Sequence, residues 1–185
     1  MKNTFTIGLY PKKQIVKPTS PEEIARISNE LNTISGLTIE DISQLLVPPY
    51  SFSWSPAIFS GKRSNQNWKQ QQVFALDFDG GISPDAVLKR FKEFGITPNI
   101  LYYTFSDTPI TRKFRVLLFV DVVITELDFR NYIQMGLKNL FPESDPHCHD
   151  ASRFFFGGTQ SEVLNSDPIQ LIELFNCISI AQNFG

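Results

Sequence analysis

Two aspartates, Asp77 and Asp79, end an apolar run and are followed by Gly80 and Gly81. In a strand, successive side chains point to opposite faces, so these two carboxylates project from the same face. Carboxylates this close repel each other unless a cation lies between them. A divalent ion such as Mg²⁺ takes carboxylate oxygens and keeps positions for phosphate and water. The pattern therefore indicates metal-dependent phosphate chemistry, although Asp-x-Asp-Gly at a strand end is also ordinary turn sequence.

Basic and polar side chains suited to phosphate follow the paired aspartates along the chain. Lys113 and Arg115 alternate onto one face of an apolar segment. The planar guanidinium group binds phosphate oxygens in pairs, so arginines and acids on a common face fit a metal-held triphosphate. The other candidates on neighbouring segments are Ser106, Asp107, Asp145, Asp150 and Arg153.

The elements that must position these residues follow the order β-α-β-β-α-β. This order predicts an α+β fold with a ferredoxin-like, RRM-like βαββαβ core, in which a four-stranded antiparallel sheet carries both helices on one face. The other face is then free to hold a site. The predicted strands cover residues 73–79, 99–105, 113–120 and 153–156, and the predicted helices cover 83–94 and 125–140.

The segments outside this core are predicted as an extension at each end. Cap residues and prolines predict helices over residues 20–32 and 38–47, and an irregular loop over 48–72 follows them. A last helix is expected from the Asp167-Pro168 cap to about Cys177. We predict a single domain, 1–185, with a helical and loop extension over 1–72, a core over 73–158 and a C-terminal helix within 159–185.

Composition excludes some classes of protein and leaves others open. The chain has 185 residues, 42% of them hydrophobic, which is enough for a real core. It has no apolar run of about 18 residues and no secretory h-region, so we expect no membrane association. Cys148 and Cys177 form no metal-binding spacing, which favours a reducing, cytoplasmic compartment. The net charge is −2, but residues 1–72 carry eight Lys/Arg against five Asp/Glu.

The ordered motifs resemble the catalytic core of the archaeo-eukaryotic primase superfamily, especially the primase-polymerase domains of bacterial plasmids, phages and other mobile elements. The likeness covers roughly residues 55–160. In that family a strand-borne hhhDhDxG motif supplies two metal-binding acids, a Ser-x-His or Ser-His motif lies near the nucleotide phosphates, and a third motif is an Asp followed by an Arg. The matching segments here are 74–80, 103–108 and 145–155, preceded by a Gly-Lys-Arg-Ser segment at 61–64 and Trp68.

The resemblance implies a DNA-dependent primase/polymerase, a nucleotidyltransferase that uses two Mg²⁺ or Mn²⁺ ions in DNA replication of a mobile element. Asp77 and Asp79 would bridge the metals, with Asp145 or Asp150 as the third ligand. The Asp-to-Arg gap of the family favours Asp145, whereas the Asp-x-Ser-Arg pattern of the nearer relatives favours Asp150. The implied substrates are nucleoside triphosphates.

The same resemblance assigns the remaining candidates and partners. The implied template is single-stranded DNA, and a replicative helicase is a candidate partner. Nucleotide binding would fall to Ser106, Asp107, Lys113, Arg115 and Arg153, and nucleic-acid binding to Lys62, Arg63 and Trp68.

The second motif departs from the family, because Asp107 stands where a histidine is expected. An acid does not donate a proton to a phosphate and adds negative charge. This departure keeps open an alternative, a non-catalytic nucleic-acid-binding module for replication initiation with the same fold. A rolling-circle nuclease, suggested by His147 and His149, is disfavoured because no tyrosine follows Tyr132.

Overall fold

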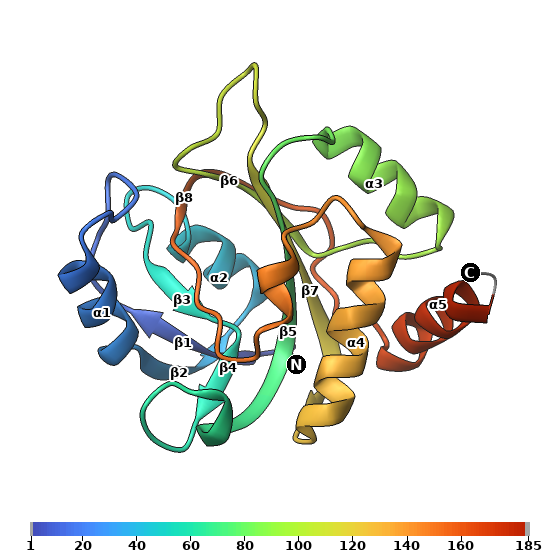
Figure 1. The fold of residues 1–185 in the computed structure, drawn as a ribbon, viewed down its shortest axis with the longest axis horizontal. Coiled ribbons are helices and arrows are strands. Elements are labelled where there is room, and N and C mark those ends of the chain that lie inside the picture. Colours follow the sequence, from blue (N-terminus) through green and yellow to red (C-terminus); the bar gives the residue numbers. More distant parts are fainter. Residues whose placement is uncertain (1, 184–185) are drawn as a thin grey trace.

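The computed structural model describes residues 2–183 of the chain. Within this range an α+β fold is built on a five-stranded antiparallel sheet with the order β4-β5-β7-β6-β8 (Figure 1). The expected α+β class and antiparallel core sheet are confirmed. The strands of this sheet are β4 (Ala57–Phe59), β5 (Trp68–Phe78), β6 (Ile100–Thr104), β7 (Phe114–Ile124) and β8 (Gly158–Val163).

The two long central strands, β5 and β7, carry apolar side chains on both faces. They pair antiparallel with Leu76 opposite Val116 and Phe78 opposite Phe114. Strands buried on both faces read as continuous apolar runs, which is why the sequence identifies this pair. The alternation places Asp77 and Arg115 together on one face of the sheet.

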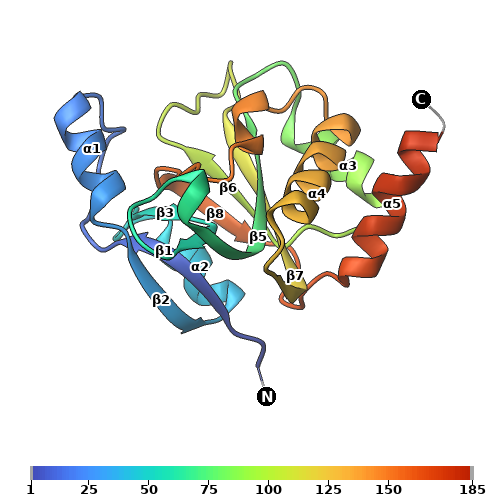
Figure 2. The ribbon, with the colours of Figure 1, turned by 60° about the horizontal axis from the view of Figure 1, so that its bottom comes forward.

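Three helices cover the opposite face of the sheet, which we call the helical face (Figures 1 and 2). The caps predicted at Ser20, Thr38 and Ser83 form where their helices begin, whereas the last helix begins at Leu171 and not at the expected Asp167-Pro168 cap. Ser83, for example, accepts a hydrogen bond from the backbone of Ala86, and Pro84 occupies the first turn. Within residues 2–183 the structure has no helix long and apolar enough to cross a membrane. These helices are α3 (Pro84–Glu93), α4 (Leu127–Leu140) and α5 (Leu171–Asn183).

The N-terminal extension packs on the other face, and it contains a three-stranded sheet that the sequence analysis did not predict. The two expected helices are present, but β1, β2 and β3 form an antiparallel sheet of order β2-β1-β3 beside them. β2 is mostly exposed and polar, so it carries no apolar pattern. The bounds are β1 (Phe5–Tyr10), α1 (Pro21–Asn29), β2 (Asn32–Leu37), α2 (Ile39–Leu45) and β3 (Ser53–Ser55).

A second apolar core fills the space between this extension and the sheet. Trp54 is fully buried there and donates its Nε1–H to the hydroxyl of Tyr102 at 3.1 Å. Phe5 packs edge-on against Phe119 of β7. The face that was expected to be free is therefore covered along most of its length. Near Asp77 and Thr104, the end of the sheet opens on this side into a cavity.

The fourth core strand lies later in the chain than expected. Residues 153–156 form no ladder, and Phe155 makes only an isolated bridge to Trp54. The strand is β8, which pairs with β6 at the edge of the sheet. A Cβ on Gly158 would lie 1.9 Å from the carbonyl oxygen of Tyr103, so this glycine permits close backbone approach at the start of β8.

Candidate functional site

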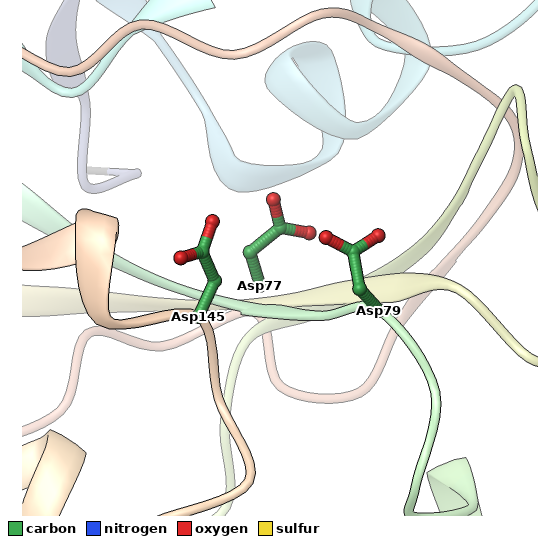
Figure 3. A group of neighbouring side chains, drawn as sticks. All are labelled: Asp77, Asp79 and Asp145. Atoms are coloured by element: carbon green, nitrogen blue, oxygen red, sulfur yellow. The ribbon is translucent and has the colours of Figure 1, made fainter.

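Three acids from separate parts of the chain converge at the end of β5. Asp77 is the penultimate residue of β5, Asp79 follows the strand, and Asp145 precedes the short 3₁₀ helix η2 (Pro146–His149). One carboxylate oxygen from each lies within 4.8 Å of the others (Figure 3). Such an all-oxygen set of acids suits a hard divalent cation such as Mg²⁺ or Mn²⁺.

Backbone geometry fixes the approach of the third acid. The N–H of Asp145 donates to the carbonyl of Asp77 at 2.7 Å, so the turn after α4 is bonded to the end of β5. The Asp145 carboxylate accepts hydrogen bonds from the backbone N–H of His147 at 2.9 Å, and its Oδ1 lies 2.8 Å from the His147 Nδ1. Burial raises the pKa of Asp145, but these bonds and the charge of Arg153 outweigh it and lower the pKa overall.

Asp77 is the buried member of the group. Its side chain is 3% exposed, and burial raises its pKa despite the charge of Arg115. The Oδ1 atom lies 3.0 Å from Arg115 Nε, yet within residues 2–183 neither atom has a hydrogen-bond partner, so the N–H does not point along a bond to that oxygen. An oxygen left without a hydrogen bond beside two other carboxylates fits a cation ligand.

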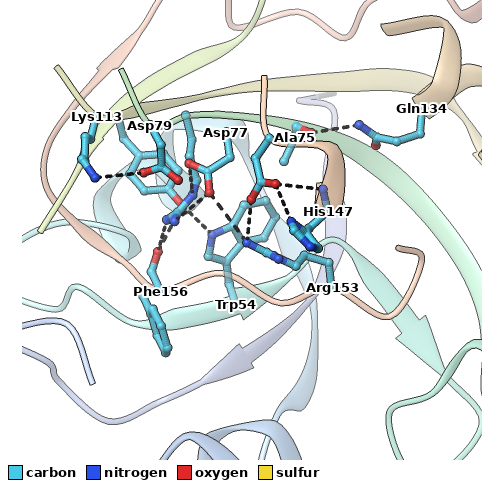
Figure 4. A network of polar contacts seen from close by, with 12 residues as sticks. Trp54, Ala75, Asp77, Asp79, Lys113, Gln134, His147, Arg153 and Phe156 are labelled. Atoms are coloured by element: carbon cyan, nitrogen blue, oxygen red, sulfur yellow. Dashed lines mark hydrogen bonds and ion pairs between the residues drawn. The ribbon is translucent and has the colours of Figure 1, made fainter. Parts of the chain in front are cut away.

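Asp77 and Asp79 line a cavity of about 360 Å³ whose wall is rich in cations, and Asp145 lies beside them outside its lining. Lys113 Nζ lies 3.5 Å from Asp79, and Arg153 NH2 lies 3.2 Å from Asp145 (Figure 4). Arg115 donates to the Phe156 carbonyl at 2.8 Å, which holds the 150–157 segment over the sheet. A cavity that combines clustered acids with several cations is suited to an anionic ligand bound together with a metal.

Comparison with known proteins bears on the fold. No family model and no curated protein matches the sequence. Among solved structures, the chain is similar to the AEP domain of the primase-polymerase of cyanophage S-2L, with a TM-score of 0.52 and 10% sequence identity. The match covers 95% of this chain and 88% of that one. The fold of this chain is therefore similar to that of the AEP domain of this primase-polymerase.

The residues of the second motif are divided between the cavity and a neighbouring loop. Ser106 lines the cavity, as expected of a nucleotide contact. Asp107 does not line it, because its carboxylate accepts hydrogen bonds from the backbone of Lys113 at 2.7 Å and from Arg112 at 3.0 and 3.2 Å. The acid that replaces the expected histidine thus caps the β6–β7 loop, and Arg112 offsets its charge.

Asp150 lines the cavity but lies outside the three-acid group. Its carboxylate accepts from the backbone N–H and the hydroxyl of Ser152, at 3.0 and 2.9 Å. Burial raises the pKa of Asp150, but the bonds from Ser152 and Asn65 and the charge of Arg63 outweigh it and lower the pKa overall. Of the two alternatives for the third ligand, the geometry groups Asp145 with the paired aspartates.

The candidates for nucleic-acid contact are scattered. Arg63 lines the cavity, donates to Ser28 at 2.9 Å and to the Ser152 carbonyl, and lies over the Phe154 ring. Lys62 is exposed and lines an adjoining cavity. Trp68 packs against the core of the helical face and is not brought to either cavity.

Lys17 is a cavity residue that sequence reasoning missed. It lines the wall opposite the sheet, together with Ile24 of α1. Lys17 lies in an irregular segment before the Ser20 cap, and no motif marks it. Its only sequence signal was the excess of positive charge in residues 1–72, which identifies no single residue.

Proposed function

We propose that this chain is a metal-dependent nucleotidyltransferase of the primase-polymerase type, which extends a strand on a single-stranded DNA template in the replication of a mobile element. The observation that carries the proposal is the group formed by Asp77, Asp79 and Asp145, two of which, Asp77 and Asp79, line a cation-rich cavity. The primase fold supports it. We further propose that the whole chain is one such domain.

In this proposal Asp77, Asp79 and Asp145 hold the Mg²⁺ or Mn²⁺ ions. The ions would supply activation of the attacking 3′-hydroxyl and neutralisation of the charge on the leaving pyrophosphate. The proposal fits the donor set because all three groups are carboxylates and one oxygen of Asp77 has no hydrogen-bond partner within residues 2–183.

The cations of the wall would bind the triphosphate. Each of three basic residues lies within ion-pair distance of an acid of the group: Lys113, Arg115 and Arg153. Metal ions would therefore bind the acids while the neighbouring basic side chains bind the phosphate oxygens. Such preorganised charges stabilise the charge that develops on phosphate oxygens. Ser106 would add a hydroxyl donor, and Lys17 a further cation from the N-terminal side.

Template contact is assigned to exposed positive charge near the cavity. Lys62 and Arg63 follow β4; Arg63 lines both cavities and Lys62 lines the adjoining one, so a backbone leaving the site would pass them. Phosphate contacts of this kind position a strand without reading its sequence. Trp68 is retained only as a proposal for base stacking, because it lies on the helical-face core.

The decisive experiment is template-directed synthesis. The protein is incubated with single-stranded DNA, primed or unprimed, nucleoside triphosphates and Mn²⁺ or Mg²⁺. We expect extended product from the natural chain and from Asp85→Asn, an exposed acid on α3, but none from Asp77→Ala or Asp79→Ala. Template binding without synthesis in the natural chain would instead support the non-catalytic module. Synthesis undiminished in both alanine variants would refute the proposed site.

A further inference from the structure

Helix α4 carries an arginine whose whole side chain is inside the protein. Arg130 is 1% exposed, and within residues 2–183 none of the ion pairs includes it. Its guanidinium is instead surrounded by uncharged oxygens. It donates to Gln71 at 3.1 Å, to Asn131 at 3.1 Å, to the Cys148 carbonyl at 3.3 Å and to the His149 carbonyl.

Two of these acceptors belong to the turn that carries the third acid. Cys148 and His149 are the last residues of η2, and Asp145 is its N-cap. The turn is held at its start by the N–H of Asp145 on the Asp77 carbonyl. Arg130 binds the other end of the turn through the carbonyls of Cys148 and His149. A turn fixed at both ends leaves its N-cap carboxylate little freedom to move away from β5.

The same helix is also bonded to the strand that carries the first acid. Gln134, one helical turn after Arg130, donates to the Ala75 carbonyl of β5 at 3.1 Å. Gln71, which accepts from Arg130, is a β5 residue as well. Residues 130 and 134 therefore connect α4 to both the turn of Asp145 and the strand of Asp77.

We propose that Arg130 is a positioning residue that fixes Asp145 against Asp77 and thereby sets the affinity of the three-acid group for divalent metal. This inference rests on the proposed function, because it assigns a role to that same site. Arg130 contacts neither the three acids nor the cavity, so it acts through its bonds to the backbone of η2 and to Gln71 of β5. The planar fork of arginine reaches two adjacent carbonyls at once, which the single ammonium of lysine does not reproduce.

The positioning role of Arg130 favours metal binding, whereas its positive charge by itself disfavours metal binding. Burial lowers its pKa to about 10, so the group stays protonated at neutral pH. A positive charge near the acids disfavours a second cation, so removal of the charge by itself would tighten metal binding. Loss of positioning would weaken it. The sign of the change therefore separates the two roles.

The test is a calorimetric titration with Mn²⁺, without nucleotide, of the full chain and of Arg130→Lys and Arg130→Met. We expect the dissociation constant for Mn²⁺ to rise about tenfold or more in both variants, the usual range for loss of a group that orients metal ligands. The matched control is Asn99→Ala. Asn99 is also fully buried and bonds three backbone groups, but at the far end of β6.

Thermal unfolding without metal accompanies each titration. If Arg130→Met does not fold, Arg130→Lys decides. Unchanged or tighter Mn²⁺ binding in a folded Arg130 variant would overturn the inference, and so would an equal loss of affinity in Asn99→Ala. Absence of Mn²⁺ binding by the natural chain would overturn the inference and the metal site together. Weaker binding in the variants without any synthesis by the natural chain would uphold the positioning role while the polymerase proposal fails.

Discussion

Asp77 and Arg115 face each other across the neighbouring strands β5 and β7, and Arg115 Nε lies 3.0 Å from Asp77 Oδ1. Both side chains are at least nine-tenths buried. Removal of one partner of such a pair leaves an uncompensated charge in the interior, and this is far more costly than loss of a surface pair. The pair therefore couples the stability of the fold to the chemistry of the site.

Arg115→Met should lower the free energy of unfolding by about 3 kcal/mol or more in the presence of a chelator. Mg²⁺ should restore part of this loss, because the ion offsets the charge of Asp77. Urea denaturation with and without Mg²⁺ measures both effects. The control is Lys113→Met, whose partly exposed pair with Asp79 should contribute less than about 1 kcal/mol. Equal losses in the two variants would contradict the buried pair.

Substitution of Asp145 should reduce activity far more than substitution of Asp150. Asp145→Asn should reduce primer extension by about 100-fold or more, because it removes a ligand charge from the three-acid group. Asp150→Asn should retain activity within a few-fold, since its carboxylate accepts bonds from Ser152. Single-turnover extension at saturating Mn²⁺ measures the difference. Ser152→Ala, which disturbs the same turn, is the control for Asp150. The reverse order of the two effects would make Asp150 the third ligand.

The part of the site that the sequence predicts is local. Asp77 and Asp79 are recognisable because a buried strand has a continuous apolar pattern and period-two alternation fixes their common face. The helix caps at Ser20, Thr38 and Ser83 were equally recognisable, and each side chain accepts its expected backbone bond. Signals of this kind need no information from distant parts of the chain.

The part that was missed depends on long-range packing. β1 pairs with β3 through Gly8 opposite Ser55, and the exposed β2 adds no apolar signal. Whether Asp145 or Asp150 lies beside Asp77 and Asp79 depends on the direction of η2, and the backbone bond from Asp145 to Asp77 fixes that direction. Lys17 reaches the cavity only because the N-terminal extension packs against the sheet. Residue spacing carries none of this information.

Asp107 should behave as a structural cap of the β6–β7 loop. Asp107→Ala should lower the melting temperature more than Asp107→Asn, because the amide oxygen of asparagine keeps the bond from the Lys113 N–H. Asp107→His, which restores the motif histidine, should not increase synthesis, since it breaks the bonds from Arg112. Thermal unfolding and primer extension measure these effects. A gain of activity in Asp107→His would show that the acid acts on the nucleotide.

Acid unfolding should depend on a pair that joins α3 to the segment before Asp145. Arg90 bonds Glu143 with both terminal nitrogens and lowers the pKa of Glu143 to about 2 from an ordinary value of 4.5. Between these pH values the unfolded chain binds more protons than the folded one, so stability falls as the pH falls through this window. Urea midpoints from pH 6 down to about 2 should decline less steeply in Glu143→Gln. Identical profiles would exclude this contribution.

Lys62 and Arg63 are adjacent in sequence, but Lys62 should contribute to template binding alone, whereas Arg63 should also stabilise the fold. Lys62 is exposed, so Lys62→Ala should weaken template binding and reduce the slope of log affinity against log salt by about 0.7, the value for one phosphate contact on a single strand. Arg63→Ala should also lower the melting temperature, because Arg63 bonds Ser28 and Ser152. Anisotropy of labelled single-stranded DNA over a salt series gives the slopes. Lys89→Ala, an exposed lysine on α3 across the sheet from the cavity, should leave affinity and slope unchanged, and a change equal to that of Lys62→Ala would mean that the contacts are not localised at the cavity.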